Sequence, residues 1–515
     1  MKVKKIFFNT FIVLLLTSLS SQGAVLDYLS PADPLNPETV KNSRKESIYS
    51  LTPQKVKLTQ NYVRNHYEIG MQKFMQANVK SAYRDFELLI QNIVPNDYAY
   101  LRMADEMAEI GLFNLSNEAL NHTSDKDISY VQADDIRKFY FPKNMPEVKD
   151  EIYLAEVYSN IMYNAQGKEA TAELVKKTSL MEKSDYANYI AALGSLKTDN
   201  TDEAEKYINK ALKINPDNIS YQKLKIEISL QKENSSAALK ILANIEKETF
   251  STANYKDKID ILKEYVLYKT EKNDVMKKYH LASYYYLQNE NAKALRTLQT
   301  AISTKKKYNK LVYALMSAVY YNQKEYEKAQ SFADKSIQLG GGDKYSLMVL
   351  GKVNYRNQNY KEAIKNFKSV PASNDTEPQV WTAMAYSASG NEKQAKEIYQ
   401  KILKERSDCP EAYYNIALKD KDRAVTYYKK AVTANPSFID GWAGLAKSAI
   451  DTNNLTAAGK YLEIVKYIDE NDFRYYYYQG LVYKAKGLHQ DANYYFKRSL
   501  AINPDNEPAK KELGI

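Results

Sequence analysis

The sequence contains very little cysteine, glycine and proline. Its 515 residues include 1 Cys, 16 Gly and 14 Pro. A single cysteine, Cys409, excludes an internal disulfide, and we expect a small thiol, buried or half-buried, just before Pro410. Few glycines and prolines argue against an all-β chain, which needs many tight turns. The scarcity of turn-forming residues therefore predicts a protein built from long helices.

Residues typical of common active sites are also scarce. The four histidines are His66, His122, His280 and His489, and no two of them lie at the spacing of a zinc site. We find no cysteine pair, no serine-hydrolase elbow and no phosphate-binding loop, and the glycine run 340–342 predicts a helix end. We therefore expect no catalytic residue, no metal and no cofactor. An enzyme with an unrecognised site is the remaining alternative.

Charge of one sign is not concentrated in any part of the chain. The 73 Lys and Arg residues against 63 Asp and Glu residues give a formal net charge of +10. Lys and Glu are interspersed, as they are on solvated protein surfaces. This distribution predicts no nucleic-acid partner.

Long apolar runs are absent except at the amino terminus. Lysines precede the apolar stretch 6–16, and small or polar residues follow up to Ala24. This pattern is typical of a secretory signal peptide and predicts that residues 1–24 are removed. The mature chain is then exported, as a periplasmic, envelope-associated or secreted protein without a transmembrane span. An uncleaved anchor is the alternative. Residues 25–57 hold several prolines without a helical period, which predicts an extended lead-in.

From about Tyr62 onward, apolar and small residues recur three and four positions apart, which is the period of a helix. Alanines within this pattern recur at intervals of 34 or 35 residues. They are Ala204 and Ala238; Ala294, Ala329 and Ala363; and Ala424, Ala458 and Ala492. The sequence of residues 214–218 also recurs at 502–506, each time closing a helical stretch. A near-constant interval predicts tandem helix pairs.

Other residues follow the same frame. One set is Gly351, Ala363 and Phe367, and another is Tyr476, Gly480, Tyr483, Ala492, Phe496 and Pro504. In this frame the chain resembles the tetratricopeptide repeat, whose pattern is W-x2-L-G-x2-Y, then A-x3-F, then P, in 34 residues. The resemblance implies an all-α fold, a right-handed superhelical solenoid of tandem helix-turn-helix repeats.

The frame also predicts how the chain is organised. The parts are the signal peptide at 1–24, the lead-in at 25–57, divergent N-terminal repeats at 58–275, and a C-terminal array with a short end cap at 276–515. Segments 121–150 and 246–273 depart from the frame, although the second contains a possible added helix. The repeat from Glu411 to Pro436 is shortened, with helices predicted at 412–418 and 424–434.

The resemblance implies that the first helix of each pair lines a concave groove where ligands lie. The groove residues it predicts are Tyr279, Tyr286, Tyr321, Asn322, Met348, Tyr355 and Arg356, with Leu287 and Ala314 beside them. Tyr286, Tyr321 and Tyr355 hold one place in three successive repeats. The tyrosines that directly precede this place, among them Tyr285 and Tyr320, are expected in the core. Chance alignment is the alternative, because 46 residues are Tyr.

These features predict a non-catalytic, protein-binding scaffold or adaptor of a bacterial cell envelope. Tyrosine suits such a surface, because it offers a large apolar face, a polar tip and few rotatable bonds. The partner is then a protein or peptide. The alternative is a glycan-binding envelope protein that stacks sugars on the tyrosine row.

Overall fold

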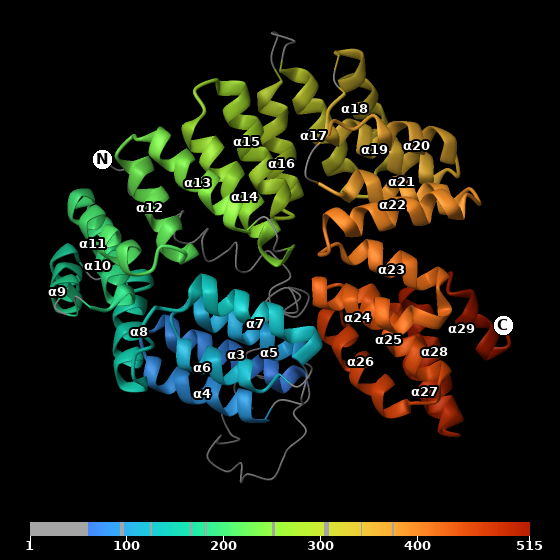
Figure 1. Cartoon of the computed structure of the whole chain (residues 1–515), viewed down its shortest axis with the longest axis horizontal. Coiled ribbons are helices and arrows are strands. Elements are labelled where there is room, and N and C mark those ends of the chain that lie inside the picture. The colour runs from blue at the N-terminus through green and yellow to red at the C-terminus, as the bar shows by residue number, and fades with distance from the viewer. Residues whose placement is uncertain are drawn as a thin grey trace. The chain divides into compact units, whose positions relative to one another are not determined.

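The computed structural model describes residues 60–515, apart from the gaps 93–96, 124–125, 165–166, 180, 182, 250–252, 303–307, 341 and 373–374. The predicted signal peptide and lead-in lie outside the described residues. Wherever the chain is described, its regular elements are helices, which confirms the all-α prediction (Figure 1). None of these helices is both long and apolar enough to cross a membrane.

The chain forms two compact units. Unit 1 is Met1–Glu233 together with Ala449–Ile515, and unit 2 is Asn234–Ser448. The helices of unit 1 are α3 (Gln60–Met75), α4 (Val79–Asn92), α5 (Asp97–Glu109), α6 (Phe113–Asn121), α7 (Lys126–Tyr140), α8 (Val148–Met162), α9 (Lys168–Ser179), α10 (Asp185–Lys197), α11 (Thr201–Ile214), α12 (Ile219–Gln231), α26 (Leu455–Ile468), α27 (Phe473–Ala485), α28 (His489–Ile502) and α29 (Glu507–Leu513). Helix α25 (Ile439–Asp451) includes the boundary between the units.

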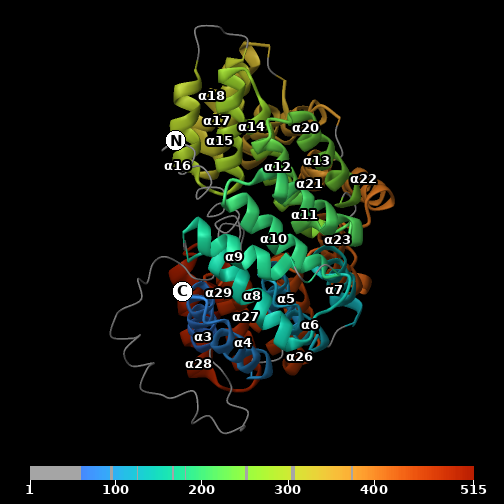
Figure 2. The ribbon, with the colours of Figure 1, turned by 90° about the vertical axis from the view of Figure 1, so that its left-hand side faces the viewer.

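Unit 2 consists of consecutive antiparallel helix pairs. Its helices are α13 (Ser235–Thr249), α14 (Ala253–Thr270), α15 (Asp274–Leu287), α16 (Asn291–Ala301), α17 (Asn309–Asn322), α18 (Tyr326–Gln338), α19 (Lys344–Arg356), α20 (Tyr360–Lys368), α21 (Glu377–Ala388), α22 (Glu392–Glu405), α23 (Pro410–Lys419) and α24 (Ala424–Ala434). Helix α17 contacts α18, α18 contacts α19 and α19 contacts α20, and these four helices lie close together in Figure 1. Figure 2 shows α17 beside α18. The helix pairs expected from the repeat frame are therefore present.

Many of the described pairs are closed by the same backbone turn. One residue between the two helices takes a left-handed conformation, at Ala77, Gly111, Asp199, Asn289, Lys324, Gln358, Gly390, Asn453 and Gly487. The N–H of the next residue then donates to the carbonyl oxygen five residues earlier, at 2.8 to 3.0 Å. This bond satisfies a carbonyl at the helix end that would otherwise lack a partner. From Asn289 through Lys324 and Gln358 to Gly390 the turn recurs at intervals of 32 to 35 residues, so it repeats the interval of the sequence frame there.

Replacing Lys324 or Gln358 with Gly is expected to stabilise the protein by about 0.5 to 1 kcal/mol. Their φ angles are +62° and +60°. A residue with a side chain is destabilised by about 1–2 kcal/mol in this conformation. Glycine removes that strain, but its greater freedom in the unfolded chain offsets part of the gain. Urea unfolding measures the change. The exposed Lys497→Gly on α28 is the control and should destabilise by about 1 kcal/mol, because glycine is a poor helix former.

Close packing within a pair follows the predicted frame. A Cβ atom added to Gly70, Gly351 or Gly480 would overlap the ring of the aromatic residue on the second helix, which is Phe86, Phe367 or Phe496. Each ring is at most 1% exposed. Glycine therefore allows the two helices to approach where a large aromatic side chain fills the space beside them.

The shortened repeat keeps both of its predicted helices. Helix α23 covers the predicted 412–418, α24 begins and ends as predicted, and a 3-10 turn at Lys421–Arg423 joins them. Asp420 accepts the N–H of Arg423 at 3.3 Å and its guanidinium at 2.6 Å. A side-chain cap therefore replaces the left-handed turn at this position.

Segment 121–150, which departs from the repeat frame, is hydrogen-bonded to the repeats through buried polar side chains. Asn215 and Asn218 donate to the carbonyl oxygens of Phe141 and Tyr140, each at 2.9 Å. Oδ2 of Asp185 accepts a hydrogen bond from the backbone N–H of Lys143 at 2.9 Å. It also accepts hydrogen bonds from Asn215 Nδ2 and from the Tyr221 hydroxyl, each at 3.3 Å. Asp185 and Asn218 are fully buried. These bonds add to the packing of α7 against α5 and α12.

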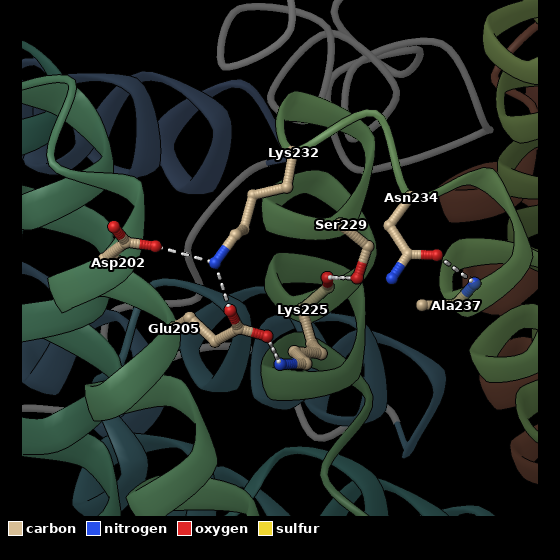
Figure 3. Close-up of polar contacts among 7 residues, drawn as sticks. All are labelled: Asp202, Glu205, Lys225, Ser229, Lys232, Asn234 and Ala237. Carbon is tan, nitrogen blue, oxygen red and sulfur yellow. Dashed lines mark hydrogen bonds and ion pairs between the residues drawn. The ribbon is translucent and has the colours of Figure 1, made fainter.

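Ion pairs join α11 to α12. Lys232 contacts Asp202 at 2.7 Å and Glu205 at 2.6 Å, while Lys225 contacts the other oxygen of Glu205 at 2.6 Å (Figure 3). Hydrogen bonds from Lys225 and Lys232 lower the pKa of Glu205 to about 2. Because the pairs are partly or fully exposed, each adds at most about 1 kcal/mol. In the same view Asn234 caps α13 through the N–H of Ala237 at 3.1 Å.

A buried carboxylate caps α6. Glu151 on α8 is fully buried, and its Oε2 accepts the N–H and the side-chain amide of Asn114, each at 2.9 Å. Helix N-termini favour negative charge. Burial has the larger effect and raises the pKa of Glu151 to about 8, although the bonds from Asn114 lower it. The folded protein therefore holds a proton here that the unfolded chain releases near pH 4.5.

Glu151→Gln is expected to reduce the pH dependence of stability. Between pH 4.5 and about 8 the folded state binds the proton more tightly, so stability falls as pH rises, by at most roughly 1.4 kcal/mol per pH unit. Glutamine removes this dependence. The stability of the variant relative to that of the wild type should therefore rise as pH rises across that window. Urea unfolding at several pH values measures it. Parallel stability curves for the two proteins would show that Glu151 is already ionised in the folded protein.

Candidate binding face of unit 2

The first helices of three successive pairs lie next to one another. Helix α15 contacts α17, α17 contacts α19, and α19 contacts α21. Tyr286, Tyr321 and Tyr355 occur near the carboxyl ends of α15, α17 and α19, and each is half-buried. Burial raises the pKa of all three hydroxyls, so they are neutral at physiological pH. We call this surface the tyrosine face.

Two of these tyrosines each pack against an equivalent tyrosine at the start of the next helix. Tyr321 meets Tyr326 edge to face with ring centroids 5.4 Å apart, and Tyr355 meets Tyr360 in the same way at 5.6 Å. Such pairs add about 0.5–1.5 kcal/mol beyond the area they bury. The sequence analysis missed Tyr326 and Tyr360, although the two five-residue spacings recur 34 residues apart.

Trp381 on α21 extends the aromatic surface and was also missed. Its ring is 5.5 Å from that of Tyr355 and 5.7 Å from that of Phe367. Lys352 lies between Trp381 and Tyr321, at 5.3 and 5.7 Å from the ring centroids, and contacts Glu377 at 2.7 Å. The half-buried tryptophan is therefore held by both aromatic and charged neighbours.

The structure corrects part of the predicted groove. Met348 is 4% exposed and packs beside Phe367, and Ala314 is 1% exposed. Tyr279 packs against the cluster formed by α15, α16 and α17. Met348 and Ala314 were expected at the groove surface, but both are buried, and Tyr279 is half-buried.

Tyr345 occupies the α15 end of the tyrosine face. Ala318 on α17 is small, and Tyr345 of α19 packs against the same cluster as Tyr286 of α15. The rings of Tyr286 and Tyr345 meet edge to face at 5.8 Å. The α15 end of the tyrosine face is thus filled by the protein's own side chain, whereas Tyr321 and Tyr355 keep the partners described above.

Two predicted polar residues are at the surface. Asn322 is exposed, and its hydrogen bond to Tyr286 partly offsets the effect of burial on the pKa of that tyrosine. Arg356 is exposed, with its guanidinium carbon 4.2 Å from the ring centroid of Tyr326. The neighbouring Leu287 is half-buried.

The tyrosines expected in the core lie at its margin. Tyr285 and Tyr320 pack against the cluster of α15 to α17 but are only half-buried. Lys293 and Lys328 cover their rings at 5.6 and 5.4 Å. Tyr386 and Tyr483 are likewise half-buried, with Lys368 5.0 Å and Lys486 5.9 Å from their rings.

Two other titratable groups, His280 and Cys409, have partners or surroundings that the structure defines. His280 contacts Glu264 at 2.8 Å beside the tyrosine face, but the described residues contain no group of His, Cys, Asp and Glu suited to a metal ion. Cys409 is buried as predicted, and burial raises the pKa of its thiol to about 11. Such a thiol is a poor nucleophile at neutral pH.

Three helix pairs match models of a known family. The matches are to the tetratricopeptide repeat at residues 187–218, 379–408 and 411–438, which are α10–α11, α21–α22 and α23–α24. These segments are tetratricopeptide repeats. The match at 411–438 includes the shortened repeat. The predicted resemblance is thereby confirmed for these segments, and the closing turn recurs in neighbouring pairs.

The chain is also similar to other repeat proteins. A TPR repeat-containing protein of Methanocaldococcus jannaschii is 24% identical over 381 residues, which are 64% of this chain and 66% of the relative. A tetratricopeptide repeat protein from Parabacteroides merdae has a TM-score of 0.38 and 15% identity, covering 47% of this chain and 98% of its own. The APC/C hetero-tetramer Cut9-Hcn1 gives a TM-score of 0.38 and 15% identity, covering 90% of this chain and 97% of the matched chain.

Proposed function

We propose that this protein is a non-catalytic scaffold that holds a protein partner along the tyrosine face of unit 2. The observation that carries the proposal is the placement of Tyr286, Tyr321 and Tyr355 on adjacent first helices, each half-buried. Tetratricopeptide repeats generally act in protein interaction. Stacked repeats offer a continuous surface on which a partner buries area over several helices.

The side chains of the face suit this role. Half-buried tyrosines lose little rotamer freedom on binding, because neighbouring rings already position them. Their exposed edges offer apolar contact, and their neutral hydroxyls donate hydrogen bonds. Trp381, Lys352 and Asn322 add a large apolar ring, a cation and an amide. The protein holds its partner by complementarity and makes or breaks no covalent bond.

The scaffold acts outside the cytoplasm, in the cell envelope of a bacterium. The lysine-rich start, the short apolar stretch 6–16 and the small residues before Ala24 support export. Amino-terminal sequencing of the mature protein tests this, with a start at or near Val25 expected. Recovery of the intact amino terminus in the cytosolic fraction would refute it.

The proposal predicts that replacing Tyr286, Tyr321 and Tyr355 together with Ala lowers partner affinity at least tenfold. Loss of aromatic anchors from an interface costs about 2 kcal/mol or more for the strongest positions. The wild-type protein is immobilised, envelope extract is applied, and retained proteins are identified and purified. Their affinities for wild type and variant are then compared.

Two variants separate binding from folding. The double variant Tyr153→Ala/Tyr494→Ala removes tyrosines that are 40% and 59% exposed elsewhere, and it should bind normally. The triple Tyr→Phe variant keeps the rings, and it should retain most of the affinity. Unchanged affinity of a folded triple Ala variant refutes the proposal. Retention of envelope polysaccharide instead of protein would favour the glycan-binding alternative.

A further inference from the structure

The exposed arginine on the tyrosine face, Arg356, differs from three other arginines that pair with a nearby aspartate. Arg406, Arg423 and Arg474 each donate to the carboxylate of an aspartate two or three residues away, at 2.6 to 2.8 Å. Arg356 makes no ion pair in the part of the chain that the structure describes. It lies over the ring of Tyr326, 4.2 Å from the centroid.

This contact fixes the position of the guanidinium. Tyr326 belongs to α18 of the preceding pair, so Arg356 joins two repeats. The last turn of a helix is favourable for a cation, but that effect does not require an aromatic ring from another helix. Stacking on the face of the ring leaves the N–H groups at the edge of the guanidinium directed outward. The arginine is thus exposed and held in place before any partner binds.

A second cation lies one turn away on the same helix. Lys352 approaches the ring of Tyr321, and Tyr321 meets Tyr326 edge to face, so the four side chains form one cluster. Glu377 already neutralises Lys352 at 2.7 Å. The cluster therefore carries one uncompensated positive charge, that of Arg356.

We propose that Arg356 binds the carboxylate of an aspartate or glutamate side chain in an extended segment of the protein partner. The planar, forked guanidinium matches the two oxygens of a carboxylate. Tyr321 and Tyr355 flank the site and accept large apolar side chains of the same segment. The inference rests on the proposed function, because it names the chemistry that the tyrosine face recognises.

A selection with the full-length purified protein tests the inference. The probe is a random linear peptide library displayed on phage through its carboxyl end, so that only side chains can supply a carboxylate. It is selected on wild type, on Arg356→Gln, and on Arg296→Gln, which removes an exposed arginine from a second helix. We expect acidic residues next to large apolar residues among binders of wild type and Arg296→Gln, and no acidic enrichment with Arg356→Gln.

One selected peptide and its Glu→Gln analogue are then measured by fluorescence anisotropy. The acidic peptide should lose about tenfold or more affinity for Arg356→Gln, and the analogue should bind both proteins alike. Equal losses for the two peptides would overturn the inference, as would binders without acidic residues or binding that requires phosphoserine.

The outcomes distinguish the inference from the proposed function. Binders that depend on Tyr286, Tyr321 and Tyr355 but not on Arg356 leave the scaffold in place and refute the carboxylate site. Failure of the wild-type protein to retain any peptide refutes binding of an extended segment, and the carboxylate site with it. Circular dichroism of Arg356→Gln confirms that the exposed substitution leaves the fold intact.

Discussion

Replacing Gly111 with Ala is expected to lower the free energy of unfolding by roughly 3 kcal/mol. Gly111 forms the turn between α5 and α6 with φ +83°. An L-residue in this conformation costs about 1–2 kcal/mol. A Cβ atom would also overlap the hydroxyl of Tyr186 and lie 3.1 Å from its Cε1. Overpacking of this kind adds about 1–3 kcal/mol.

Tyr186 has little room to move away. It is 3% exposed, and its ring meets that of Phe113 edge to face at 4.8 Å. Gly487→Ala is the matched control, because Gly487 forms the equivalent turn at φ +75° with no atom within 4 Å of an added Cβ. Gly487→Ala should lose only the roughly 1–2 kcal/mol that the left-handed backbone conformation costs an L-residue. Adding Tyr186→Phe to Gly111→Ala should recover part of the loss. Equal losses in urea unfolding for the two alanine variants would contradict the steric explanation.

Asp185→Ala is expected to destabilise unit 1 by about 3 kcal/mol or more. The fully buried carboxylate accepts from Lys143 N, Asn215 Nδ2 and the Tyr221 hydroxyl. Alanine leaves these donors without their acceptor, and each buried donor so deprived costs about 1 kcal/mol or more. Urea unfolding measures the loss.

The matched control is Asp202→Ala, whose side chain is 89% exposed and pairs with Lys232. Removal of an exposed pair should change stability by less than about 1 kcal/mol. A double-mutant cycle of Asp185→Ala with Tyr221→Phe should show coupling, because the two groups are 3.3 Å apart. Additive effects would mean that Tyr221 finds another acceptor.

The sequence predicts those parts of the fold that depend on spacing along the chain. The approach of Gly351 to Phe367 and the two helices of the shortened repeat follow from the 34-residue frame. Helix pairs contact mainly their neighbours, so local periodicity carries most of this information.

The tyrosine face was predicted less completely, because its details depend on side-chain size on different helices. The sequence places Tyr286, Tyr321 and Tyr355 at one position of the repeat. It does not show that Tyr345 meets Tyr286 where α17 carries Ala318. Contacts between non-neighbouring helices have no signature in a single sequence.

The repeated pentapeptide shows the same limit. Its two copies have the same residues but different partners. Asn218 donates to the carbonyl of Tyr140, whereas Asn506 donates to the Ser499 hydroxyl at 2.8 Å. A motif fixes its own conformation, and the surrounding chain decides what its side chains bind.

The bonds from Asn215 and Asn218 also bear on how quickly the protein folds. They connect residues 74 and 78 positions apart, whereas most helices here pack against their neighbours along the chain. Local contacts form rapidly, but closing a long loop costs entropy before its bonds can form. Residues 140–143 should therefore acquire protection from hydrogen exchange later than the helix pairs beside them. Around residues 140–143, the order of folding is then set by hydrogen bonds that do not follow the repeat.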